Sequence, residues 1–162
     1  MKQKSFAGNI VLGLNDALIE LSGVLVGLTL AFQDSKSILV AGLLTGVAAS
    51  LSMGASSYLQ AKQEAHEGSG KHPVTSASYT GLAYILTSCC LLLPFLLLSD
   101  HFLALGVMVG VVFSIIAGFT YYVSVLRKQS FIKNFFEMAA ISTSIGLVSF
   151  VIGYFLQGVV GV

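Results

Sequence analysis

The sequence has little charge and no tryptophan. Of its 162 residues only 9% are charged, whereas 56% are hydrophobic, and the mean hydropathy is +0.90. Soluble domains carry about 25% charged residues, so this composition excludes an ordinary soluble domain and indicates an integral membrane protein. The formal net charge of +1 comes without a basic patch, so we predict no nucleic-acid partner.

Cysteine and proline are also scarce, with two of each, while glycine occurs 17 times. Cys89 and Cys90 are adjacent. Neighbours in a helix point to different sides, so we predict neither a disulfide nor a two-cysteine metal site. Few prolines and many glycines are typical of helices that pack closely in lipid.

Long apolar runs make up most of the chain. About 20 mostly apolar residues cross the hydrocarbon core of a bilayer, and five stretches meet this length: residues 9–31, 38–60, 79–98, 102–125 and 137–160. The longest polar break, residues 61–78, is too short for a soluble domain. We therefore predict an all-α membrane protein with one transmembrane domain over residues 1–162 and a polar cytoplasmic loop at 61–78.

Lysine and arginine are unevenly distributed between the polar breaks. With five spans, the N-terminus and the second and fourth connections share one side of the membrane, and that side holds seven of the eight basic residues. Because basic residues favour the cytoplasmic side, we predict a cytoplasmic N-terminus and an external C-terminus. An odd number of spans does not divide into equal inverted halves, so we expect any two-fold symmetry to come from a homodimer.

Two acids, Asp16 and Glu20, lie one turn apart inside the first span, with no lysine or arginine nearby. An ionised acid near the centre of a membrane helix costs at least about 2.5 kcal/mol. Either these acids are protonated, or they face a water-filled path, or they bind a cation. A carboxyl withdrawn from water can carry a proton as well as a metal ion. The alternative is a neutral pair that only hydrogen-bonds a neighbouring helix.

The acids recur at helical spacing with small residues. On a regular α-helix one line contains both acids and all three glycines of the first span, in the order Asn9, Gly13, Asp16, Glu20, Gly23 and Gly27. This pattern predicts a single face on which the glycines let another backbone approach. A similar line in the second span contains Gly42, Gly46, Met53 and Glu64.

Met53 lies about as deep in the second span as Asp16 lies in the first, within the small-residue stretch "SMGASS". A thioether beside a carboxylate indicates a first-row transition metal, with Fe²⁺ or Mn²⁺ the best candidates. The alternative for a methionine in a membrane helix is simple packing. One aspartate, one glutamate and one methionine are too few ligands for an octahedral ion, and a two-fold interface would double the set.

Acidic residues also lie at the cytoplasmic end of the second span. Glu64 extends the Met53 line to this end, and with Glu67, one turn further, it would gather cations before they enter. The alternative is an ordinary solvated helix end. That alternative is the one we favour for Glu67, His66 and His72.

The segments "GLNDALIELSGVLVGLTLAF" and "AGLLTGVAASLSMGASSYLQAKQE" resemble the vacuolar iron transporter family. The resemblance implies five spans and a homodimer, with a metal path lined by the first and second helices at the dimer interface. It implies proton antiport of Fe²⁺, often also of Mn²⁺, out of the cytosol. The metal is then a transported substrate, and no permanently bound cofactor is expected. Asp16, Glu20 and Met53 match the two acids and the methionine of the family motifs, with proton coupling assigned to Glu20 or to the acid pair.

The chain departs from the family pattern in its second span and in the loop that follows. Ser57 stands where many members carry a glutamate, which removes one carboxylate from an inner vestibule that Ser57 and Glu67 would border. The loop is also too short for the metal-collecting domain of eukaryotic members. These features resemble a short prokaryotic-type member, for which a cytoplasmic (inner) membrane is expected.

Other classes of membrane protein fit less well. A small proton-coupled multidrug exporter also uses an acid in its first span, but this span has no aromatic residue before Phe32. Asp16 is the only aspartate inside a span and all three histidines lie in loops, so we predict no enzyme of the intramembrane protease type. A non-transporting scaffold remains as a further alternative.

Overall fold

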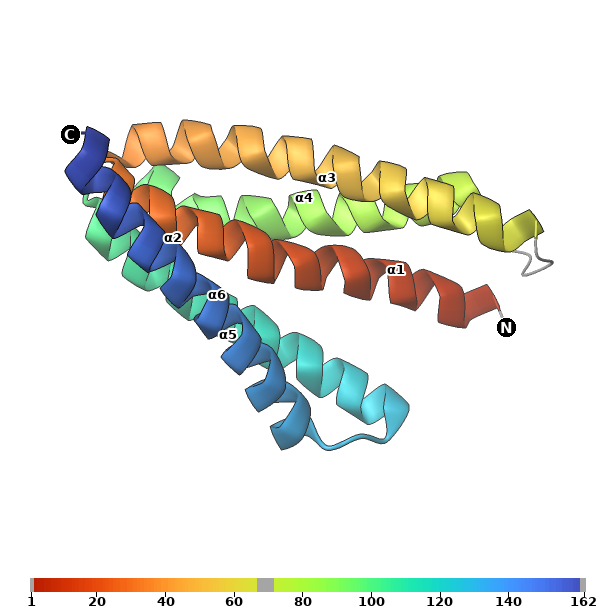
Figure 1. Cartoon of the computed structure of the whole chain (residues 1–162). Coiled ribbons are helices and arrows are strands. Elements are labelled where there is room, and N and C mark those ends of the chain that lie inside the picture. Colours follow the sequence, from red (N-terminus) through yellow and green to blue (C-terminus); the bar gives the residue numbers. More distant parts are fainter. Residues whose placement is uncertain (1, 67–71, 161–162) are drawn as a thin grey trace.

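The computed structural model describes residues 2–66 and 72–160, which form helices joined by short turns. The elements are α1 (Lys2–Asp16), the π-helical turn η1 (Ala17–Leu21), α2 (Ser22–Ala31), α3 (Ser35–His66), α4 (Pro73–Leu97), α5 (His101–Arg127) and α6 (Phe131–Val160). α1, η1 and α2 follow one another without a break and form one long first helix (Figure 1).

Five helical segments are long and apolar enough to cross a membrane, namely Ala7–Ala31, Ser35–His66, Pro73–Leu97, His101–Arg127 and Phe131–Gly158. The prediction of an all-helical protein with five such helices is therefore confirmed. Several helices extend beyond the apolar runs from which they were predicted. A helix ends where its backbone hydrogen bonds end and not where hydropathy falls.

The connection between the helices of the second and third spans is shorter than predicted. We expected a loop over residues 61–78, but α3 continues to His66 and α4 begins at Pro73. The polar residues of α3 remain helical, and Gln60 Nε2 donates a hydrogen bond to Glu64 Oε1 at 2.9 Å. Proline at the first position of α4 is favourable because the N–H it lacks has no partner inside the helix. Glu67 lies outside the described residues.

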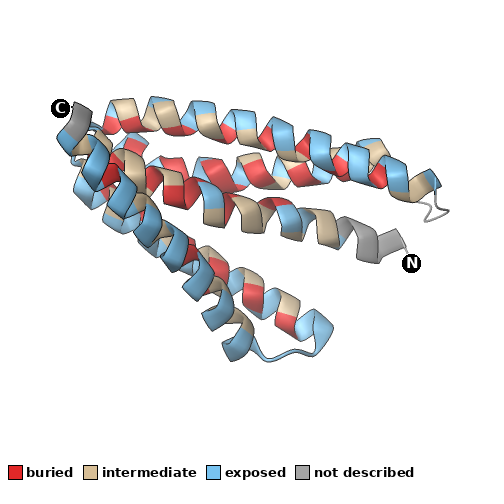
Figure 2. Ribbon diagram, viewed as in Figure 1, coloured by how far each residue is buried: buried red, intermediate tan, exposed pale blue. Residues whose placement is uncertain are grey.

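The helices form two groups that share the first helix. α3 and α4 lie side by side and α1 packs mainly on α4, whereas α2 packs mainly on α6. The α5–α6 hairpin diverges from α1 toward the end at which α1 begins (Figure 1). The hydrophobic core lies where η1, α2, α4 and α5 converge, and its fully buried side chains include Leu18, Leu21, Leu25, Leu91, Met108 and Ile116. Figure 2 shows how much of α5 and α6 is exposed, as expected for surfaces that face lipid.

Small residues on α3 form the seam with α4. Every third or fourth residue is buried, in the order Gly42, Gly46, Ser50, Gly54, Ser57 and Ala61. A methyl group on Gly42 would lie 2.7 Å from side-chain carbons of Leu25 and Leu92. The seam therefore holds α3 close to α4 along most of its length, as small residues do in membrane helices.

The turns before α3 and α5 are closed by aspartates. The carboxylates of Asp34 and Asp100 each accept a hydrogen bond at 2.8 Å from the backbone N–H three residues later. Hydrogen bonds from the side chain and backbone of Ser37 lower the pKa of Asp34. These contacts satisfy N–H groups at the start of each helix and explain why both turns are short.

Candidate functional site

Asp16 and Glu20 come together where α1 meets η1. Asp16 is the last residue of α1 and Glu20 lies within the π-helical turn. The two carboxyls lie one helical turn apart and close enough to interact. Asp16 is half-buried and Glu20 is exposed. The acids therefore form an interacting pair that is open on one side.

Tyr84 of α4 completes this group. Its side chain is fully buried, at 0% exposure, and its hydroxyl donates a hydrogen bond to Glu20 Oε2 at 3.3 Å. Sequence analysis did not identify this residue. The signal was present, because Thr80, Tyr84 and Ser88 form a polar line at helical spacing in the third span.

Thr80, one turn before Tyr84, ties the first two spans to α4. A methyl group on Gly13 of α1 would collide with the Thr80 carbonyl. On another side of α4, the hydroxyl of Ser57 donates a hydrogen bond to Thr80 Oγ1 at 2.9 Å. Ser57 is only 4% exposed, so it faces α4 and does not line an open vestibule.

Met53 lies on α3, and the contacts between α3 and the first helix indicate its depth relative to the acid pair. A methyl group on Gly42 would contact Leu25 and one on Gly46 would contact Leu21, which defines an antiparallel register between α3 and the first helix. Continued along both helices, this register brings Met53 level with Leu14, half a turn before Asp16. Met53 is half-buried. α1 and α3 both pack on α4 more than on each other.

Glu64 lies apart from this group. It is half-buried near the end of α3, three turns or about 16 Å along the helix from Met53. Among residues 2–66 and 72–160, no three His, Cys, Asp or Glu side chains come together in a way that could hold a metal ion. The two acids therefore belong to no larger His, Cys, Asp or Glu cluster within these residues.

The predicted single face of the first helix is not present. Gly13 faces α4, whereas Gly23 and Gly27 face α6, where added methyl groups would lie 2.9 Å from Ile145 Cγ2 and 3.2 Å from the Ser149 carbonyl. The π-helical turn between these glycines contains an extra residue, so residues on its two sides no longer share a line.

Sequence analysis also missed the partner of Gly27. A methyl group on Gly153 of α6 would lie 2.6 Å from the Gly27 carbonyl, so the two backbones are in contact. The spacing Ser149-x-x-x-Gly153 is the small-residue motif of closely packed membrane helices and is readable in the sequence. The contact fixes α2 against α6 on the side away from α4.

The chain resembles a known family over its first two spans. Residues 7–69 match the model of the VIT family. This segment carries Asp16, Glu20, Met53 and the glycines that face α4 and α6. A search of curated proteins finds no match to the chain.

Proposed function

We propose that the chain is a member of the VIT family, the vacuolar iron transporters, whose model matches residues 7–69, and that it exports Fe²⁺ or Mn²⁺ from the cytosol in exchange for protons. Membership of this family indicates metal-ion transport in general. The choice of metal, the coupling to protons, the direction and the homodimer are parts of the proposal.

The observation that carries the proposal is the Asp16–Glu20 pair. The two carboxyls interact directly inside a membrane-spanning helix, and Glu20 is exposed. Two ionised carboxylates at this distance repel each other, and the repulsion is relieved either by protons or by one divalent cation. A carboxyl pair that holds either protons or a divalent cation can exchange one for the other. Such exchange is the chemical requirement for antiport.

The register of the helices supports Met53 as a further ligand. Continued from Gly42 and Gly46, it brings Met53 close to the level of the acids, and a thioether there would favour a transition metal over Mg²⁺ or Ca²⁺. The exposed face of Glu20 leaves room for a second copy of the chain, whose acids and methionine would double the ligand set. Glu64, at the far end of α3, would attract cations from the cytosol before they reach the pair.

Flux measurements in liposomes test the proposal. Purified protein is reconstituted, a pH gradient is imposed, and the movement of Fe²⁺, Mn²⁺ and Zn²⁺ is followed. We expect Fe²⁺ or Mn²⁺ flux that depends on the gradient and falls at least about tenfold in Asp16→Ala, because loss of a metal-site group typically costs 10- to 100-fold. Glu137→Gln, which removes an exposed acid near the start of α6, is the control and should match wild type.

Two outcomes would contradict the proposal. Equal metal flux from wild type and Asp16→Ala would remove the acid pair from the mechanism. Gradient-driven movement of quaternary ammonium dyes, without metal flux, would favour the multidrug exporter instead.

A further inference from the structure

The acid pair coincides with an irregular turn of helix. Among the described elements η1 is the one π-helical turn; Glu20 lies inside it and Asp16 immediately precedes it. Such a turn holds one more residue than an α-helical turn, and its backbone hydrogen bonds have poorer geometry. It therefore persists only where the surrounding structure stabilises it.

The irregular turn decides which way the acids face. Since each residue of an α-helix turns by about 100°, one extra residue rotates α1 relative to α2 by about that angle. On a regular helix, Asp16 would lie on the same line as Gly23 and Gly27, and those glycines are pressed against α6. With η1 in place, the Glu20 carboxylate meets Tyr84 of α4 instead. The π turn therefore keeps the acids out of the α2–α6 seam.

Ser22 compensates for the hydrogen bond that the turn disrupts. In an α-helix the Ser22 N–H would bond to the Leu18 carbonyl, but here it bonds to the Ile19 carbonyl. The Ser22 hydroxyl replaces this N–H and donates a hydrogen bond to the Leu18 carbonyl. Leu18 is 0% exposed and Ser22 is 6% exposed, so this carbonyl has little access to water, and a buried carbonyl without a partner is costly.

We propose that Ser22 is a positioning residue for the metal site. By holding the Leu18 carbonyl it maintains the π turn, and the π turn sets the direction of the Asp16 and Glu20 carboxyls. The inference rests on the proposed function of that pair. It assigns a role in metal affinity to a residue that has no contact with the metal.

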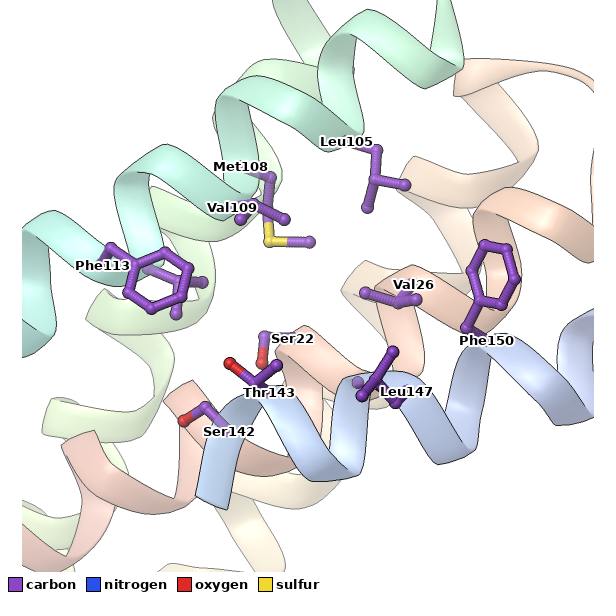
Figure 3. Close-up of a pocket in the computed structure, with 12 residues that line it drawn as sticks. Ser22, Val26, Leu105, Met108, Val109, Phe113, Ser142, Thr143, Leu147 and Phe150 are labelled. Carbon is purple, nitrogen blue, oxygen red and sulfur yellow. The ribbon is translucent and has the colours of Figure 1, made fainter. Parts of the chain in front are cut away.

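The chain offers matched variants for the test. Thr29 makes the same kind of bond, to the Leu25 carbonyl at 2.7 Å, in the regular part of α2, so Thr29→Val removes a hydroxyl outside the π turn. Ser22→Thr keeps the hydroxyl and adds a methyl group. Ser22 borders a cavity of about 260 Å³ between α2, α5 and α6, beside Thr143 (Figure 3), so the methyl group has space.

The first measurement is the concentration dependence of Mn²⁺ flux in liposomes. Loss of one buried hydrogen bond corresponds to a change of about three- to tenfold, and we expect the KM of Ser22→Ala to rise by this factor while the maximal flux changes little. Thr29→Val and Ser22→Thr should keep the wild-type KM. A KM for Ser22→Ala no higher than that for Thr29→Val would overturn the proposal.

The second measurement does not depend on transport. Amide hydrogen exchange of the purified proteins should become faster over residues 16–23 in Ser22→Ala and should stay at the wild-type rate in Thr29→Val and Ser22→Thr. If wild type carries no metal, the proposed function fails, and the exchange experiment alone decides the role of Ser22 in the π turn. Unchanged exchange in Ser22→Ala would contradict that role.

Discussion

At the scale of single residues, polar side chains of α4 contact both the acid pair and the α3–α4 seam. Tyr84 is the one that touches the pair, through its bond to Glu20, and Thr80 joins Ser57 in the α3–α4 seam. A glutamate in place of Ser57 would put a charge into this buried seam, which is expensive without a partner. Serine at this position therefore gives up a carboxylate and keeps the seam tight.

Tyr84→Phe tests the contact between α4 and the acids. The ring stays in the core while the hydroxyl that donates to Glu20 is lost. At 3.3 Å the bond is longer than is usual for a hydroxyl donor, so we expect a loss of about 1 kcal/mol, or roughly fivefold in the KM for Mn²⁺. Tyr121→Phe removes an exposed hydroxyl on α5 and serves as the control. An unchanged KM in Tyr84→Phe would show that the bond does not orient Glu20.

At the scale of helices, the glycines of the first helix let it pack closely against two different helices. Gly13 admits α4, while Gly23 and Gly27 admit α6. The π turn lies between these two contacts, so α1 can pack against α4 while α2 packs against α6. The hairpin of α5 and α6 diverges from α1 because its contacts with the first helix are concentrated on α2.

Gly13→Ala tests the α1–α4 contact. The added methyl group would collide with the backbone carbonyl of Thr80, which cannot move aside as a side chain can, so α1 has to shift. Overpacking of this kind costs about 1–3 kcal/mol, and we expect a lower Tm by circular dichroism in detergent. Gly106→Ala places its methyl group in open space and should leave the Tm unchanged or slightly higher. Equal Tm values for the two variants would be evidence against close packing at Gly13.

At the scale of the whole molecule, the proposed homodimer would bring further ligands to the acid pair. In the part of the chain that the structure describes, no further His, Cys, Asp or Glu joins it to form a metal cluster, and Glu20 is exposed. A charged group exposed within a membrane span is costly. In the proposed homodimer a second copy would cover Glu20 and add its own ligands to the pair.

Mixed dimers distinguish a shared site from two separate ones. Wild type and Asp16→Ala are co-expressed in equal amounts with different tags and reconstituted together. If both copies build one metal site, only wild-type pairs are active, so Mn²⁺ flux should fall to about one quarter of that of wild type. Flux of about one half would mean that each copy works alone. A mixture with Glu137→Gln controls for expression.

The sequence by itself determined the number of spans and singled out the acid pair. Bilayer thickness sets the length of an apolar run regardless of how helices pack, and an acid inside such a run is conspicuous in any fold. The predictions for Gly13, Gly23 and Gly27 were partly right, because small residues at helical spacing do admit neighbouring helices, although they do not share one face.

Only the tertiary structure decided which neighbour each residue faces. A hydropathy pattern assumes 3.6 residues per turn, and η1 breaks that assumption at Glu20. The hydropathy pattern also does not reveal that the Ser22 N–H bonds to the Ile19 carbonyl, three residues back. The polar line that contains Tyr84 is readable in the sequence, but the bond from Tyr84 to Glu20 and the burial of Ser57 follow from the packing of the helices.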